Sequence, residues 1–380
     1  MNGDGSTGAG DTSGTSDAGS GGASGAGSAA PGGAPGGRTV PAAVYRSRGV
    51  VEVETRHLRP PGDGEVVVEV DYCGVCGSDL HLIVEGWGTP GDVLGHEWSG
   101  RVVEVGPGVD SLERGQAVLA GAEPTCGACP ACRAGRPSQC EAQDPMTGEF
   151  DGAFATHVLS RADRLLPVPE GMDLRTAALA EPLAVALHGI TRAGLSPGDT
   201  VLVQGAGPIG AMAAAALVVA GHRVTVSEPA PARRDLARRL GAEVVHPDSL
   251  ATFDMSQVDV AADPAYHVVM DTSGKGPAID VGFQQLRRGG TLVMLGTGLE
   301  RPSFDTNRMI VMELTVRGSF VYDEGGFHRA LELLADPAFP TDELVEGEEY
   351  GLDGVAEAAV RLADGTHAGK VMIRPGAEGR

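Results

Sequence analysis

A glycine run between a short apolar strand and an alanine-rich helix is the strongest constraint on the fold of this 380-residue chain. The segment 200–204 has the apolar character of a buried strand, and 209–220 that of a helix, with Pro208 near its start and Gly221 past its end. The sequence GAGPIG between them has the G-x-G-x-x-G spacing of a dinucleotide-binding turn. We therefore predict a phosphate-binding loop made by Gly205, Gly207, Pro208, Ile209 and Gly210.

The three glycines of this run have different physical roles in such a loop. The first permits a tight turn, the second lets the backbone approach the pyrophosphate, and the third lets helix and strand pack closely. The helix N-terminus then faces the phosphates. Glu228 follows the next predicted strand, and we expect its carboxylate to bind the adenosine ribose and to repel a 2′-phosphate. NAD is the expected coenzyme, and we expect Arg233 to lie near it. Arg233 and Arg234 are both close to Glu228 in the sequence, so acceptance of NADP is the alternative.

Strands and helices continue to alternate through the second half of the chain. Such alternation predicts a parallel, doubly wound sheet, so the fold class is α/β. In the first half, the segments 65–70 and 100–105 alternate between apolar and polar residues, which predicts half-buried antiparallel strands. The remaining predicted strands are 223–227, 243–246, 267–271, 291–295 and 370–374, and the predicted helices are 232–240 and 278–286.

Composition sets the first residues apart from the rest. The first forty residues hold 14 of the 58 glycines, four charged residues and no apolar run. Such a segment buries too little to offset its ordering entropy, so we predict a disordered tail over 1–38 and no signal peptide. We expect the last strand to rejoin the first domain. The predicted boundaries are 39–188 for a mostly-β domain with a lobe at 121–144, 189–320 for the dinucleotide domain, and 321–380 for the returning segment.

Charge and cysteine content limit the partners. The formal net charge is −22, from 51 acidic and 29 basic side chains, with no basic block that would attract a phosphate backbone. We expect no nucleic-acid partner, and no membrane span, since no apolar run approaches 18 residues. All six cysteines fall within 73–140. Because we find no export signal, we expect the protein in the reducing cytoplasm, where cysteines remain reduced and their thiolates can bind metal.

Four of the cysteines have the spacing C-x2-C-x2-C-x7-C. Glycines and prolines between them allow a tight loop that brings four sulfurs around one ion. Four thiolates fill a tetrahedron and leave no position for a substrate, so this spacing predicts a structural zinc site. Free or disulfide-bonded cysteines in a loop are the alternative. The predicted ligands are Cys126, Cys129, Cys132 and Cys140.

A second set of donors comes from separate segments, as a metal site inside a folded cleft requires. Cys76 lies in CGVCGSDLH, His96 and Glu97 in GHE, and Glu181 opens EPLAVALH. A single Cys or His is more often an ordinary core or surface residue, so this prediction depends on the combination. Cys73 makes a C-x-x-C pair with Cys76, but we expect it to pack and not to bind metal.

In their order along the chain, these motifs resemble the zinc-dependent medium-chain dehydrogenases from about residue 40 to the C-terminus. The glutamates at 97 and 181 resemble the branch of sorbitol, threonine, glucose and butanediol dehydrogenases. The resemblance implies a GroES-like, mostly-β catalytic domain followed by a Rossmann domain. It also implies that Cys76 and His96 bind a catalytic zinc, with Glu97 and Glu181 binding it directly or through water.

The resemblance further implies roles in proton transfer. Ser78 would contact the substrate hydroxyl and pass its proton toward His81, while Asp79 would orient His96. A capped turn without catalytic function is the alternative for these residues. Lys370 matches a position where the family often has a basic residue near the pyrophosphate and the carboxylate beside the metal. A solvated surface lysine is the alternative there.

The expected function is hydride transfer between a secondary alcohol (a polyol, sugar, diol or hydroxy metabolite) and NAD, with two zinc ions per chain. Zinc lowers the pKa of a bound water from about 15.7 to about 7, and a comparable effect would help an alcohol to lose its proton. A zinc-free reductase of the same superfamily and a non-catalytic NAD-binding sensor are the alternatives. The resemblance implies a homodimer or homotetramer. Trp87 and Trp98 are expected in the core more than in a substrate pocket.

Overall fold

The computed structural model describes residues 37–120, 126–142, 152–323 and 325–377. The predicted tail lies outside these ranges except for its last two residues, and the predicted lobe at 121–144 is described only from 126 to 142. Strand β1 begins at Arg38, the residue at which we end the tail. None of the helices within the described ranges is both long and apolar enough to cross a bilayer.

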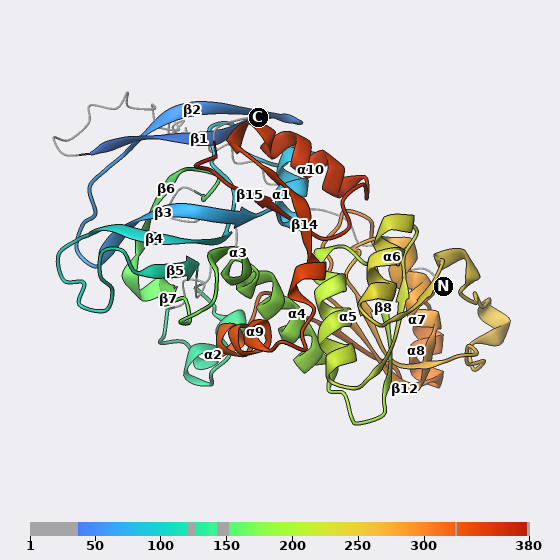
Figure 1. Ribbon diagram of the computed structural model, residues 1–380. Helices are drawn as coiled ribbons and strands as arrows, with labels where there is room; N and C mark the ends of the chain where they lie inside the picture. The colour runs from blue at the N-terminus through green and yellow to red at the C-terminus, as the bar shows by residue number, and fades with distance from the viewer. Residues whose placement is uncertain (1–36, 121–125, 143–151, 324, 378–380) are drawn as a thin grey trace, which may run out of the picture. The chain divides into compact units, whose positions relative to one another are not determined.

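In the described part of the second half, six parallel strands form one sheet (Figure 1). Their spatial order is β10-β9-β8-β11-β12-β13, so the chain crosses from one side of β8 to the other. This is the strand order of a doubly wound dinucleotide-binding sheet, which confirms that prediction. The strands are β8 (Thr200–Gln204), β9 (Arg223–Ser227), β10 (Glu243–Val245), β11 (Tyr266–Asp271), β12 (Leu286–Met294) and β13 (Thr315–Gly318).

Successive side chains of β8 enter two cores on opposite faces of this sheet. Val201 and Val203 pack in a cluster with residues of α5 and α6, whereas Leu202 packs with Phe283 of α7. A strand buried on both faces has to be apolar at successive positions, as β8 is. In Figure 1, α5 and α6 lie on one side of the sheet and α7 and α8 on the other. These helices are α5 (Pro208–Val219), α6 (Pro231–Arg239), α7 (Gly276–Gln284) and α8 (Thr306–Val311).

The first half of the chain forms a mostly antiparallel sheet. Its order among the described residues is β14-β15-β3-β4-β5-β7, with β6 paired to β3, and β1 and β2 form a separate antiparallel pair. The period of two is clear in β3, where Val66 and Val68 face the main core and Val67 faces a smaller one. The strands are β1 (Arg38–Ser47), β2 (Val50–Leu58), β3 (Glu65–Gly74), β4 (Glu97–Val105), β5 (Ala117–Ala120), β6 (His157–Arg161), β7 (Leu165–Pro167), β14 (Val345–Tyr350) and β15 (Lys370–Ile373).

The last strand of the chain belongs to the sheet of the first half. Strand β15 pairs antiparallel with β3, with Met372 opposite Gly74 and Ile373 opposite Cys73, and parallel with β14. The six parallel strands therefore lie, in sequence, between strands of this first sheet. The same pairing places Lys370, the first residue of β15, beside the end of β3.

Helix α4 (Ala180–Ala193) continues across the boundary that we placed after residue 188. It ends where Gly194 adopts the left-handed conformation, with φ of 66°, which favours glycine. The helix packs on α5 of the parallel sheet and on α9. The boundary that we predicted after residue 188 therefore falls inside a continuous helix, and the predicted domain bounds remain a proposal. The remaining helices are α1 (Gly77–Ile83), α2 (Pro130–Arg133), α3 (Leu174–Ala177), α9 (Gly326–Ala335) and α10 (Val355–Ala363).

Candidate active site

The pairing of β3 with β4 brings Cys76 and His96 together. In this antiparallel pair Gly74 lies opposite Glu97, so Cys76, two residues after β3, and His96, the residue before β4, lie at the same end of the pair. The ligand atoms of Cys76, His96 and Glu97 all lie within 4.8 Å of one another. A sulfur, an imidazole nitrogen and a carboxylate oxygen at such separations can share one ion. Cys73 is fully buried and packs in the core of this sheet, as expected.

Negatively charged groups surround the His96 imidazole. His96 is exposed as a residue, but protein surrounds much of its ring. Desolvation is therefore the largest single influence on the pKa of His96, and it lowers this pKa. The combined charges of Cys76, Asp79 and Glu181 outweigh this influence and raise the pKa of His96 well above its ordinary value. So many anionic groups around one imidazole make an environment suited to a divalent cation.

Asp79 caps the first turn of α1 and also interacts electrostatically with His96. Its Oδ2 accepts a hydrogen bond of 2.9 Å from the backbone N–H of Cys76, so it caps the first turn of α1. Burial raises the pKa of Asp79, and His96 is the strongest of the influences that lower it. The capped turn is therefore present, and the same carboxylate lies close enough to His96 to interact with its charge.

Lys370 is buried against Glu97 and is not a solvated surface lysine, so that alternative is wrong. Its Nζ lies 2.7 Å from Glu97 Oε1 and 3.1 Å from the Val75 carbonyl. Burial lowers the pKa of Lys370, but Glu97, Cys76 and other anionic groups raise it above its ordinary value. Gly74 makes room for this pair, because a Cβ there would lie 2.3 Å from Glu97 Oε2.

Glu181 approaches the same site from helix α4. It lies in the first turn of that helix and is buried, and its charge acts on both His96 and Lys370. It is not within the 4.8 Å group formed by the other three predicted ligands. Thiolate, imidazole and carboxylate are the donors that zinc takes in proteins, so the residues present fit this metal.

His81 makes two ring contacts that the predicted relay did not include. Its Nδ1 lies 2.9 Å from Glu85 Oε2 and its Nε2 lies 3.2 Å from Thr297 Oγ1, so neither of these ring contacts is with Ser78. Ser78 is exposed at the start of α1. A direct transfer from Ser78 to His81 would therefore need an intervening group or a movement of the ring.

The two tryptophans have different environments. Trp98 is buried in the core of the first sheet, as predicted. Trp87 is 44% exposed and stacks on His81, with ring centroids 4.9 Å apart, so the core assignment is wrong for it. It follows α1 in a glycine-flanked loop, where no packed layer covers it.

Each glycine of the loop has the geometry that its predicted role requires. Gly205 has φ of 88°, which favours glycine, and follows β8 directly. A Cβ on Gly210 would lie 2.1 Å from the Gly205 carbonyl oxygen, so only glycine permits this contact of helix and turn. A Cβ on Gly207 would meet only Arg233, at 4.0 Å. The backbone of Gly207 is thus open to a ligand, and Pro208 and Ile209 begin α5 behind it.

Glu228 and Arg233 both lie at this loop. The Glu228 side chain is buried, and its Oε2 and Oε1 accept hydrogen bonds of 2.7 and 2.8 Å from the backbone N–H groups of Ala206 and Ala230. The guanidinium of Arg233 lies beside Gly207 and donates to the carbonyl of His367 in the turn before β15. A carboxylate and a guanidinium therefore flank the helix N-terminus that we predict to face the phosphates.

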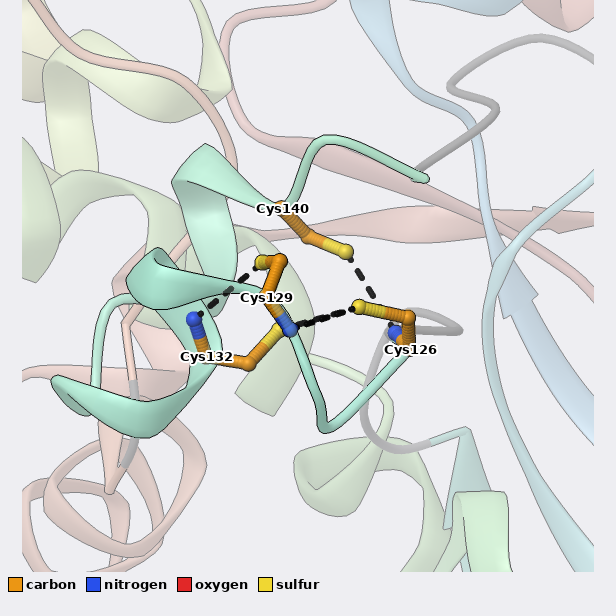
Figure 2. Close-up of side chains that lie close together, drawn as sticks. All are labelled: Cys126, Cys129, Cys132 and Cys140. Atoms are coloured by element: carbon orange, nitrogen blue, oxygen red, sulfur yellow. Dashed lines mark hydrogen bonds between the residues drawn. The ribbon is translucent and has the colours of Figure 1, made fainter.

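The four remaining cysteines converge as predicted (Figure 2). The sulfurs of Cys126 and Cys132 lie 4.0 Å apart, close to the separation of about 3.8 Å that a zinc tetrahedron with bonds of 2.3 Å requires. Backbone N–H groups point at the sulfurs, and the N–H of Cys132 is the main cause that lowers the pKa of Cys129, to about 6. All four are thiols, so the disulfide alternative is not observed. Four sulfurs at these positions fit a closed structural zinc site.

Comparisons with known proteins agree with this fold. Residues 62–170 match the alcohol dehydrogenase GroES-like domain, and residues 208–336 match the zinc-binding dehydrogenase domain. The 2-dehydro-3-deoxy-L-galactonate 5-dehydrogenase of Pseudoalteromonas atlantica is 35% identical over 77% of this chain and 87% of its own length. Sorbitol dehydrogenase of Bacillus subtilis is 31% identical over 88% of this chain and 97% of its own.

A solved structure extends the comparison to three dimensions. The crystal structure of a protein from Sinorhizobium meliloti, described as a zinc-binding dehydrogenase and bound to NADP, superposes with a TM-score of 0.76. The two chains are 30% identical, and the match covers 89% of this chain and all of that one. The chain belongs to the zinc-binding alcohol dehydrogenase family. It is an oxidoreductase that uses zinc and a nicotinamide dinucleotide.

Sequence reasoning missed two residues of this site, Glu85 and Thr297. The spacing of four residues between His81 and Glu85 was a usable signal, since such pairs share one side of a helical turn. Thr297 carries no comparable local signal, because its contact with His81 joins residues 216 positions apart. The anchoring of Arg233 on the turn before β15 was hidden for the same reason.

Proposed function

We propose that this enzyme oxidises a secondary alcohol of a polyhydroxylated substrate, such as a polyol, a sugar acid or a vicinal diol, with NAD, and that it also catalyses the reverse reduction. The close approach of Cys76, His96 and Glu97 is the observation that carries the proposal. The relatives named above act, by their names, on a sugar acid and on sorbitol. Their agreement supports a substrate with neighbouring hydroxyl groups.

Each part of the site has a proposed role. Cys76 and His96 hold a catalytic zinc, with Glu97 and Glu181 as anionic groups that bind it directly or through water. The metal acts as a Lewis acid that makes a substrate hydroxyl more acidic. Lys370 holds the Glu97 carboxylate and compensates its charge, so Glu97 binds zinc directly only when it leaves this lysine. The four cysteines at 126–140 bind the second, structural zinc.

The residues of α1 orient the substrate and receive its proton. Ser78 is exposed at the start of the helix, which supports its proposed contact with a substrate hydroxyl. Asp79 fixes the turn that follows Cys76 and stabilises His96. His81 accepts the proton that the substrate releases, through a group between Ser78 and the ring. Their positions along one short helix support a common function.

For the coenzyme, we propose NAD over NADP. Glu228 is buried at the loop with both oxygens directed by backbone N–H groups, which fixes its carboxylate where an adenosine ribose is expected. A 2′-phosphate would meet this negative charge. The position of Arg233 beside Gly207 supports its proposed interaction with the pyrophosphate, and in this proposal Lys370 contributes positive charge from the metal side.

The open edge of the parallel sheet supports a homodimer, or a homotetramer of two such dimers. Strand β13 is the last strand at one edge of this sheet in the described ranges, and Ile310 and Phe320, on either side of it in sequence, are 74% and 49% exposed. An exposed strand edge with apolar neighbours is a surface that a second copy can cover. Phe320→Glu should then shift the sedimentation of the enzyme toward the monomer. A cytoplasmic location follows from the proposed thiolate chemistry, which a reducing compartment preserves.

Two measurements test the proposed function together. Metal analysis after gentle dialysis should find two zinc ions per chain, and NADH absorbance should rise with at least one member of a panel of polyols, sugar acids and diols. One zinc or none would favour a zinc-free reductase. Two zinc ions with no NADH formed from any member would contradict the proposed activity.

A further inference from the structure

Residues outside the metal group and the glycine loop hold His81 on three sides. Glu85 contacts Nδ1 at 2.9 Å, Thr297 contacts Nε2 at 3.2 Å, and the Trp87 indole stacks on the ring with an interplanar angle of 14°. The His81 side chain is only 17% exposed, whereas that of Glu85 is 33% exposed. The imidazole is therefore fixed in position, and the carboxylate behind it remains in contact with water.

Local backbone geometry produces this arrangement. Helix α1 ends at Ile83, but the chain turns on beyond it, because the backbone N–H groups of Val84 and Glu85 both donate to the Leu80 carbonyl. Glu85 thus follows His81 by four residues on one side of the turn. The N–H of Trp87 donates to the His81 carbonyl at 3.2 Å and folds the indole back over the ring.

We propose that Glu85 is a positioning residue that selects the tautomer of His81. An ionised carboxylate can only accept a hydrogen bond, so Nδ1 must carry the ring proton when His81 is neutral. The lone pair is then on Nε2, which accepts from the Thr297 hydroxyl in this structure. Nε2 is therefore the atom that takes a proton during the reaction.

This inference rests on the proposed function, in which His81 receives the substrate proton. In the oxidation, the carbinol carbon gives a hydride to NAD and the hydroxyl oxygen gives a proton, so that the C–H and O–H bonds break and a C=O bond forms. The proton adds to Nε2 and makes an imidazolium. Glu85 stabilises this cation across the ring, as the carboxylate of a catalytic triad does for its histidine. Release of one proton to water restores the neutral ring.

A glutamate that only stabilised the end of α1 would not affect turnover or the tautomer. Glu85→Gln separates the two roles, because its amide can donate as well as accept and so no longer selects one tautomer. We expect kcat for alcohol oxidation to fall by about 10- to 100-fold, within the range of general acid–base effects. The KM for NAD should change much less, since Glu85 does not contact the glycine loop.

Nitrogen NMR of the full enzyme, with isotope-labelled histidine, supplies a readout that does not depend on activity. The wild type should show the Nδ1–H tautomer for His81, assigned by loss of its signal in His81→Asn. Thr297→Val should keep that tautomer, and Glu85→Gln should lose it. Glu85→Asp, which keeps the charge but shortens the side chain, should restore part of both the tautomer and kcat.

The control is Glu113→Gln, which removes the same charge at an exposed residue away from His81. It should have wild-type kcat and the wild-type tautomer. If Glu85→Gln keeps both wild-type properties, or if Glu113→Gln loses kcat equally, the inference is overturned. A wild-type enzyme that forms no NADH would instead refute the proposed function, and the tautomer would still be decided by the spectra.

Discussion

Lys370 and Glu97 form a buried ion pair between residues 273 positions apart, with Nζ 2.7 Å from Oε1. The exposed fraction of each side chain is 1% or less. This contact connects the last strand of the chain to the residue that follows His96. It therefore connects the strand that returns to the first sheet with the residues of the proposed metal site.

We predict that Lys370→Met destabilises the enzyme by about 3–5 kcal/mol, because Glu97 is left buried without its partner. Urea unfolding of the zinc-loaded enzyme measures the free energy. The double variant Lys370→Met with Glu97→Gln should recover at least half of this loss. Lys275→Met is the matched control, since Lys275 is the other lysine of the chain and is exposed. A single variant as stable as the wild type would show that zinc, not Lys370, compensates Glu97.

The glycine loop permits a separation of folding from coenzyme binding. Gly207→Ala places a Cβ where the nearest protein atom is 4.0 Å away, so it should fold normally and weaken NAD binding at least tenfold by blocking the backbone. Gly210→Ala forces a Cβ to within 2.1 Å of the Gly205 carbonyl oxygen and should destabilise the fold by about 1–3 kcal/mol. Calorimetric titration with NAD and thermal unfolding measure the two effects. Normal NAD binding by Gly207→Ala would contradict the predicted phosphate site.

How much of the fold could be predicted from the sequence depended on how local the signal of each element was. The bounds of β8 and β9 agree with the predicted 200–204 and 223–227, because an apolar run between turn residues suffices to mark a short buried strand. Helix α4 was not predicted, because Pro182 and an apolar surface on several sides hide its periodicity. Its burial between α5 and α9 explains that composition only once the packing is known.

The residues of the candidate active site could likewise be predicted only where their sequence signals were local. The four-cysteine group was predictable because all its ligands come from one loop with a characteristic spacing. The approach of Cys76 to His96 was expected from the combination of donor motifs and from the resemblance, but no single local pattern predicts it, since it depends on the register of β3 against β4. The contacts of Lys370 with Glu97 and of His81 with Thr297 are set by the tertiary fold, and no local pattern encodes them.

The two metal groups should respond differently to loss of one cysteine. Cys129→Ala should lower the zinc content from two to one per chain and destabilise the enzyme by more than about 4 kcal/mol, because a structural zinc contributes folding energy. Cys76→Ala should also lose one zinc but change the stability much less. Metal analysis and thermal unfolding of both variants check this. Equal destabilisation by the two would contradict the assignment of a structural and a catalytic site.

Acid sensitivity should be found at Glu65, the first residue of β3. Hydrogen bonding from Arg59 is the largest cause that lowers its pKa, from 4.5 to about 2. A depressed carboxyl pKa stabilises the fold above the unfolded value, so this contribution is complete above about pH 5.5 and is lost as the pH falls from 4.5 toward 2. Since Arg59 is 53% exposed, we expect only about 1–2 kcal/mol at neutral pH.

Unfolding of Glu65→Gln as a function of pH measures this contribution. The variant should be less stable than the wild type at pH 7 and equal to it near pH 2. Asp163→Asn removes an exposed ion pair with Arg161 and should change stability by less than about 0.5 kcal/mol over the same range. A constant difference between Glu65→Gln and the wild type across this range would contradict the predicted linkage.

The central claim is that the metal group formed by Cys76 and His96 carries the oxidation. The most direct measurement is NADH formation from the best substrate of the polyol panel by the wild type, by Cys76→Ala and by Cys73→Ala, with zinc content determined on the same samples. Cys73 is three residues away and packs in the core outside the metal group. We predict that Cys73→Ala retains two zinc ions and activity, and that Cys76→Ala retains one zinc ion and forms no NADH. NADH formation by Cys76→Ala at the wild-type rate would contradict the claim.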